Sequence, residues 1–186
     1  MTGPVDGVAD GVDGATGGAN ETRERIAAAI AADPGVYFSE LVRTLDLAPG
    51  QVQYHLRKLG DRVVAADLYG RTHYYPPDTD PFERRALAVL RRETAADIVV
   101  SLLRHGPSAP ATVADRVDVA RSTLEWHLER LTDLGLVAKR RDERGRVTLV
   151  LENPDETAEY LGTVDPSLPD RMVDRFTRLL DRLLAE

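Results

Sequence analysis

The chain has 186 residues, a formal net charge of −7 and 42% hydrophobic residues, which suits one large domain or two small ones. It has no cysteine, so disulfides, thiolate metal sites and cysteine nucleophiles are excluded. The longest apolar run, residues 98–103, is too short to cross a bilayer, and no basic-then-apolar secretion signal opens the sequence. We therefore expect a cytoplasmic protein that has no membrane partner.

Residues 1–20 are rich in glycine and carry three aspartates but no basic residue. Such a segment buries too little apolar surface to offset the entropy lost on ordering. It is predicted to be a disordered acidic tail, and Asn20 is predicted to cap the helix that follows.

Residues 21–66 align with residues 93–138 without a gap when the sequence is shifted by 72 positions. The alignment predicts that one module occurs twice, in domains 21–79 and 94–151. Identical residues occupy matched positions in pairs that include Ile26 with Ile98, Asp46 with Asp118, Ala48 with Ala120, His55 with His127, and Leu59 with Leu131.

Each module is predicted to contain three helices. In the second, Thr94 and Asp97 give a capping-box signature for a helix that ends near Gly106, and another helix covers residues 110–117. A short turn precedes the third helix, whose buried face is predicted to hold Leu124, Leu128 and Leu131. In the first module, Pro49 marks the first position of the third helix.

A two-stranded hairpin is predicted to follow each third helix. The second module has strand-like runs at residues 136–141 and 146–151 around a turn at 142–145. The first module has a shorter hairpin within residues 63–75 that turns at Tyr69-Gly70.

The two modules are predicted to be joined by a connector helix at residues 80–93. Asp80-Pro81 supplies the start signal, and Leu87 and Leu90 are expected to face inward. Asn153-Pro154 repeats this signal for a short helix.

Residues 152–186 carry nine acids and four arginines, so the ends hold the acidity and residues 21–151 are close to neutral. An apolar stripe in this segment could pack on the second module, but its width favours a homodimer helix. The predicted dimerisation residues are Met172, Val173, Phe176, Leu179, Leu180 and Leu183.

The stretches DVARSTLEWHLERLTDLGLVAKR and DLAPGQVQYHLRKLGDRVVAA resemble the winged helix-turn-helix of MarR- and ArsR-like transcriptional regulators. The resemblance implies a mainly α fold with small β-hairpins, in which two tandem winged-helix domains precede a C-terminal amphipathic helix. Both third helices follow an alanine, Ala48 or Ala120, where such regulators often have Ser or Thr. The acid-rich, lysine-poor composition resembles proteins of halophilic archaea, although high genomic GC content would also favour arginine.

The outward faces of the third helices carry groups that can read bases, and they could equally be ordinary solvated faces. Gln pairs with adenine, Arg with guanine and Lys with phosphate, and a wing reaches neighbouring phosphates. With the repeat and the winged-helix pattern, these groups favour double-stranded DNA as the partner. The predicted DNA-contacting residues are Gln51, Gln53, Tyr54, Arg57, Lys58, Arg71, Arg121, Ser122, Thr123, Trp126, Arg130, Arg140, Arg144 and Arg146.

The modules are expected to divide this work. The first has a basic third helix and a wing with few charges, whereas the second has Glu125 and Glu129 on its third helix but a basic wing, KRRDERGR. We therefore predict base readout by the first helix, phosphate contacts by the second wing, and a few base contacts from Arg121 and Ser122. Trp126 could contact DNA, but packing against the other module or a partner chain is favoured.

No catalytic, metal or cofactor motif is found, and His55 and His127 are interpreted as structural histidines. The prediction is a sequence-specific DNA-binding transcriptional regulator that is not an enzyme. The alternative is a winged-helix scaffold for protein interactions, which Glu125 and Glu129 would suit. The sequence identifies no small-molecule effector.

Overall fold

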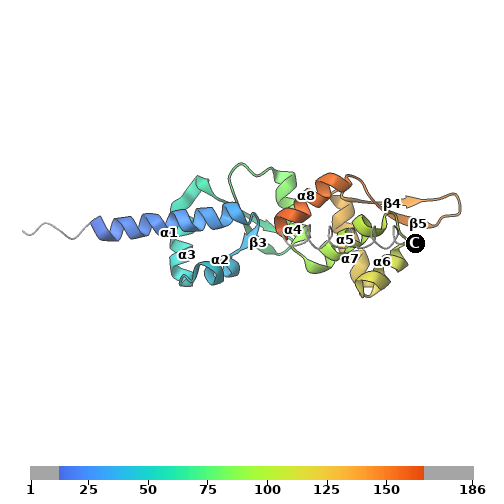
Figure 1. Cartoon of the computed structure of the whole chain (residues 1–186), viewed down its shortest axis with the longest axis horizontal. Coiled ribbons are helices and arrows are strands. Elements are labelled where there is room, and N and C mark those ends of the chain that lie inside the picture. Colours follow the sequence, from blue (N-terminus) through green and yellow to red (C-terminus); the bar gives the residue numbers. More distant parts are fainter. Residues whose placement is uncertain (1–12, 166–186) are drawn as a thin grey trace, which may run out of the picture.

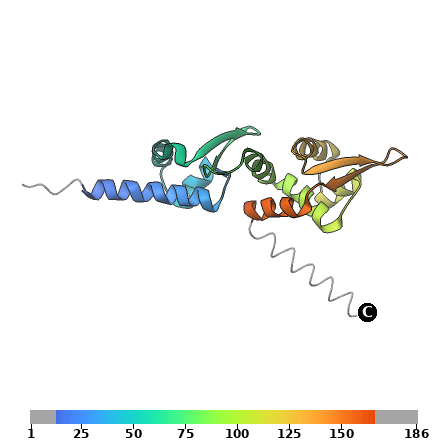
Figure 2. The ribbon, with the colours of Figure 1, turned by 90° about the horizontal axis from the view of Figure 1, so that it is seen from above.

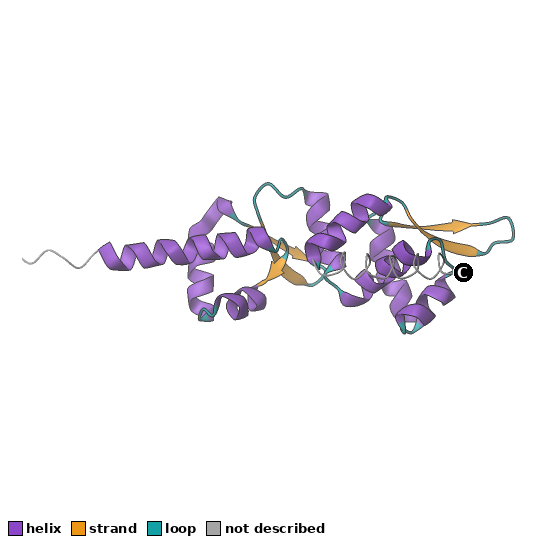
Figure 3. Ribbon diagram, in the orientation of Figure 1, coloured by secondary structure: helices purple, strands orange, loops and turns teal. Residues whose placement is uncertain are grey.

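The computed structural model describes residues 13–165, with side chains from residue 18 onward. Two helical units, each with its own hairpin, follow one another along the long axis of the molecule (Figures 1 and 3). The arrangement is a tandem winged-helix fold, as predicted, and each unit buries its own hydrophobic cluster.

The first module is a helical unit with a three-stranded sheet. Its elements are α1 (Asp13–Ala32), β1 (Val36–Tyr37), α2 (Phe38–Leu45), α3 (Pro49–Leu59), a 3₁₀ turn (Gly60–Arg62), β2 (Val64–Leu68) and β3 (Arg71–Tyr75). The strands are antiparallel in the order β1-β3-β2, and the sequence pattern did not reveal the two-residue β1. The core is formed by Ile26, Ile30, Val36, Leu41, Val52 and Leu59.

Helix α1 begins earlier than the sequence predicted. It starts at Asp13, so residues 13–20 are helical and not a disordered tail, and residues 1–12 lie outside the described part. Asn20 lies inside this helix and accepts a hydrogen bond from Arg23 at 3.4 Å, so its prediction as a cap is also wrong. Because burial of Ile26 and Ile30 anchors the helix, extension toward the N-terminus needs no new nucleus.

The second module repeats the helices and the hairpin. Its elements are α5 (Glu93–His105), α6 (Pro110–Val117), α7 (Arg121–Asp133), β4 (Val137–Arg141) and β5 (Val147–Leu151). A single antiparallel bridge between Ser108 and Leu149 takes the place of a third strand. The capping-box prediction is wrong, because α5 begins at Glu93 after Arg92 and Thr94 is already helical.

The connector helix α4 (Pro81–Leu90) packs with the second module and with α8 (Pro154–Val164). The Asp80 side chain accepts a hydrogen bond from the Phe82 backbone amide at 2.7 Å, which confirms the predicted cap. Leu87 and Leu90 are buried, as expected. Helices α4 and α5 are separate, because a turn at Arg91 and Arg92 interrupts the helix.

The same two arginines hold the modules together. The Arg91 side chain, 7% exposed, forms ion pairs with Asp33 and, at 3.3 Å, with Glu40 of the first module. Arg92 donates a hydrogen bond to the backbone oxygen of Tyr69 at the tip of the first hairpin. Gly35 has φ +88°, a conformation that favours glycine, and a Cβ there would lie 3.1 Å from Arg91 Nε, so a larger residue would also crowd Arg91. Figure 2 shows the first hairpin directed toward the second module.

Candidate nucleic-acid interface

Helix α3 presents one face to the core and the opposite face to solvent. Val52 and Leu59 are buried in the core of the first module, and His55 is buried beside them. The predicted contact residues on this helix are all exposed: Gln51, Gln53, Tyr54, Arg57 and Lys58.

The start of α3 is fixed by its own residues. Pro49 occupies the first turn, and the Gln51 side chain accepts a hydrogen bond from the Ala48 backbone amide at 3.1 Å. Gln51 therefore supplies one half of a capping box, and the other half, which a Ser or Thr side chain at position 48 would supply, is absent. The preceding turn is tight, since Asp46 has a left-handed φ of 52°.

A shallow pocket of about 260 Å³ separates α3 from the first hairpin. Gln53 and Arg57 line its α3 side, and Ala65 and Tyr74 line the strand side. Arg57 makes no ion pair with any residue between 18 and 165, so its guanidinium is available to a ligand.

Helix α7 repeats this arrangement in the second module. Its core face is formed by Leu124, Leu128 and Leu131, as the sequence predicted. Arg121, Ser122 and Thr123 make up its exposed first turn. These three side chains lie at the N-terminal end of α7, and residues at this end of the recognition helix contact base edges in helix-turn-helix proteins.

Trp126 lies on the outer face of α7 and is not buried against the first module, whereas its predicted packing against a partner chain stays a prediction. It is 42% exposed, with the Arg130 guanidinium 3.4 Å and that of Arg92 5.2 Å from its ring centroid. Arg130 also donates to the Trp126 backbone oxygen at 2.5 Å. The indole therefore holds one arginine of its own helix and one from the junction between the modules.

The acidic residues of α7 are partly neutralised. Lys139 of β4 lies 2.6 Å from the Glu125 carboxylate, and Arg130 lies 3.7 Å from that of Glu129. The Glu125 contact spans the distance from helix to wing, which is why the helix sequence alone did not reveal it.

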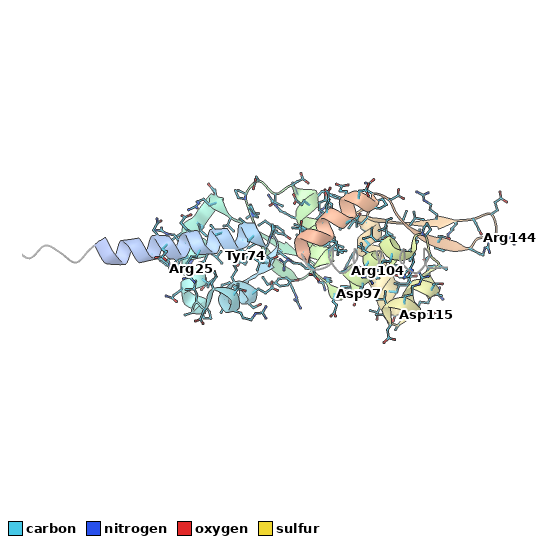
Figure 4. The ribbon with its side chains drawn as sticks, viewed as in Figure 1. Arg25, Tyr74, Asp97, Arg104, Asp115 and Arg144 are labelled. Carbon is cyan, nitrogen blue, oxygen red and sulfur yellow. The ribbon has the colours of Figure 1, made fainter. Side chains whose placement is uncertain are left out.

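The second wing projects from the body of its module, and Figure 4 shows Arg144 at its outer end. Its turn is organised by Asp142, which accepts hydrogen bonds from the backbone amides of Arg144 and Arg146, each at 2.9 Å. The Arg146 guanidinium lies 2.7 Å from the same carboxylate, and these bonds lower the pKa of Asp142. Arg140 lies 3.5 Å from Glu152.

Arg141 and Arg144 make no ion pair with any described residue, so they are the wing cations most available to an external anion.

The first wing is placed differently. Tyr69 and Gly70 both have positive φ, 51° and 80°, as in a type I′ hairpin turn. Tyr69 packs partly buried against the core of the second module, and the Arg71 guanidinium lies 5.0 Å from the ring centroid of Tyr37. The tip of the first wing is therefore used between modules, whereas the second wing is exposed.

His55 and His127 occupy matched positions behind the exposed aromatics. Their rings lie edge-on to Tyr54 and Trp126, with centroids 5.1 and 4.7 Å apart. Both Nδ1 atoms are buried without a hydrogen-bond partner among the described residues, and burial lowers the pKa of His127. No group of three or more potential metal ligands occurs within residues 18–165.

Family comparisons match both modules. Residues 20–87 match a model described as an N-terminal HTH domain, and residues 91–140 match one described as a helix-turn-helix domain. The chain therefore contains two helix-turn-helix domains. No helix between residues 13 and 165 has both the length and the apolar character that a membrane span needs.

A curated relative matches most of the chain. Over 130 residues, 69% of this chain, the sequence is 30% identical to the uncharacterized HTH-type transcriptional regulator MJ1398 of Methanocaldococcus jannaschii. The chain spans 32% of the length of that relative.

Solved structures are more distant. A crystal structure of overoxidized AbfR bound to DNA gives a TM-score of 0.38 at 18% identity, covering 56% of this chain and 82% of that one. ScpB from Mycobacterium tuberculosis gives 0.30 at 17% identity, covering 77% and 96%. Scores this low support no argument about this chain.

Proposed function

We propose that this protein is a transcriptional regulator that binds double-stranded DNA in a sequence-specific manner through two winged-helix modules. The observation that carries the proposal is a helix that occurs once in each module. Helices α3 and α7, which we call the recognition helices, each bury one face in a hydrophobic core and have on the opposite face side chains that can hydrogen-bond to bases. The two helix-turn-helix matches and the regulator name of the relative support it.

The modules contact DNA in different ways. Recognition helix α3 reads bases with Gln53 and Arg57, because amide and guanidinium groups form paired hydrogen bonds with purine edges. The β4–β5 wing binds phosphates through Arg141 and Arg144, which form no ion pair with any described residue. The docked first wing adds little to DNA binding, because its tip already packs on the second module.

The cellular setting, the homodimer and the family resemblance are proposed from the sequence alone. Domains 21–79 and 94–151 act on DNA inside the cell, and residues 172–183, which lie outside the described part, pair two chains into a homodimer. The wing and the third helix are similar to those of MarR- and ArsR-like regulators. The acid-rich, lysine-poor composition suits a cytoplasm with high salt, as in halophilic archaea.

Two variants test the division of work. Arg57→Ala is expected to weaken binding to a selected duplex by about 1–3 kcal/mol and to relax the preference at one base position. Arg144→Ala is expected to weaken all sequences alike and to lower the salt slope by about one. Affinities are measured for a selected and a scrambled duplex across a salt series. A uniform loss from Arg57→Ala together with a site-specific loss from Arg144→Ala would reverse the assignment.

A protein-binding scaffold is the second candidate, and the exposed Tyr54 and Trp126 favour it, because Tyr and Trp are frequent anchors of protein interfaces. Selection of the protein on random duplexes separates the two functions. A scaffold gives no enriched sequence, and its weak DNA binding disappears as salt rises.

A further inference from the structure

Tyr54 and Trp126 are the two large hydrophobic side chains that are exposed within residues 18–165, at 49% and 42%. They occupy the same position of the repeat, one on each recognition helix. Surface apolar residues are common singly, but two aromatics at matched sites of a duplicated module indicate a shared task.

Both rings mark the centre of the outer face. Successive residues of a helix are turned by about 100°, so the core residues Val52 and Leu59 lie about 160° and 140° around α3 from Tyr54. Leu124 and Leu131 have the same relation to Trp126. If each helix lies in a major groove with its core face outward, these rings meet the groove floor first.

On each helix one neighbour of the ring is small and another is a cation, and Arg92 from the junction is a second cation near Trp126, 5.2 Å from its ring centroid. The residue four positions before the aromatic is small, Gly50 or Ser122, and the residue four positions after it is a cation. Lys58 Nζ lies 5.8 Å from the Tyr54 ring centroid, and the Arg130 guanidinium 3.4 Å from that of Trp126. The cation lies against the ring and could reach a phosphate of bound DNA, so the exposed part of the ring is the apolar surface that a base can contact.

The floor of the major groove offers one apolar group, the 5-methyl of thymine, because the other base edges present hydrogen-bond donors and acceptors. We propose that Tyr54 and Trp126 are specificity-determining residues that recognise thymine through van der Waals contact with this methyl group. The inference rests on the proposed DNA-binding function and adds the base chemistry that the two aromatics select.

The test removes one methyl group at a time. Full-length protein is measured with its selected duplex and with duplexes in which single thymines are replaced by uracil, which keeps every hydrogen bond. Burial of one methyl group is worth about 0.8 kcal/mol, so replacing a contacted thymine is expected to weaken the wild type about fourfold. In Tyr54→Ala or Trp126→Ala, thymine-to-uracil replacements at the bases beneath the altered helix are expected to cause no further loss of affinity.

Tyr54→Ser and Trp126→Leu serve as matched controls, since a side chain without apolar surface should abolish the thymine effect and an aliphatic one should retain part of it. Uracil effects that are equal in wild type and alanine variants would overturn the inference while leaving DNA binding intact. If the wild type bound the selected and scrambled duplexes with equal affinity, that result would instead overturn the proposed function. Tighter binding of the single strand than of the duplex would also contradict the inference, because stacking on unpaired bases would then explain the rings.

Discussion

At the residue scale, the contact between Lys139 and Glu125 determines how the second recognition helix presents its charge. A carboxylate on this face would repel phosphate, but the ammonium 2.6 Å away offsets it. Both side chains are more than a third exposed, so the pair contributes at most about 1 kcal/mol to stability. We therefore expect the main effect of this ion pair to be on the affinity for DNA.

Lys139→Met is expected to weaken DNA binding about tenfold at low salt, equivalent to about 1.4 kcal/mol, because it leaves the Glu125 charge unpaired. The double variant Glu125→Gln, Lys139→Met should recover most of that loss. Binding is measured by titration of a labelled duplex for both variants. Equal losses in the single and double variants would show that Lys139 acts only as a phosphate contact.

At the element scale, the two recognition helices were largely predictable from sequence. The buried leucines of α7 and Pro49 at the start of α3 follow directly from local spacing. The roles of Lys139 and Arg92 were not predictable, because each joins segments that only the fold brings together. The extension of α1 was missed because packing of its C-terminal half outweighs the poor helix propensity of glycine.

Ala120→Ser should stabilise the second module by about 1 kcal/mol. Ala120 is the N-cap of α7, has extended backbone angles and provides no side-chain acceptor, so a serine hydroxyl can accept from a free amide of the first turn. Thermal or urea denaturation measures the change, and Ala111→Ser, an exposed position inside α6, is the control expected to give no gain. A stability below that of the wild type would mean that the introduced hydroxyl cannot adopt the capping rotamer.

At the scale of the whole molecule, the junction sets how the two recognition helices are presented together. Arg91 and Arg92 reach from the α4–α5 junction to Asp33, Glu40 and Tyr69 of the first module. Two helices with fixed spacing would engage one continuous site, since half-site spacing follows from the geometry of the protein.

Arg91→Met is expected to lower the free energy of unfolding by about 2 kcal/mol, because it removes the guanidinium and leaves the carboxylates of Asp33 and Glu40 without their ion-pair partner. Arg85→Met, on the exposed side of α4, should change it by less than about 0.5 kcal/mol. Urea denaturation compares the two. Equal stabilities would show that the junction is not held by Arg91.

Sequence-specific DNA binding by this chain can be measured by selecting the full-length protein on random duplexes at high salt. We expect one enriched sequence that is bound about a thousandfold or more tightly than its scrambled version. A footprint on that sequence should show two contacted segments, one for each recognition helix. Equal affinity for the enriched and scrambled duplexes, or no enrichment at all, would show that the chain does not read a DNA sequence.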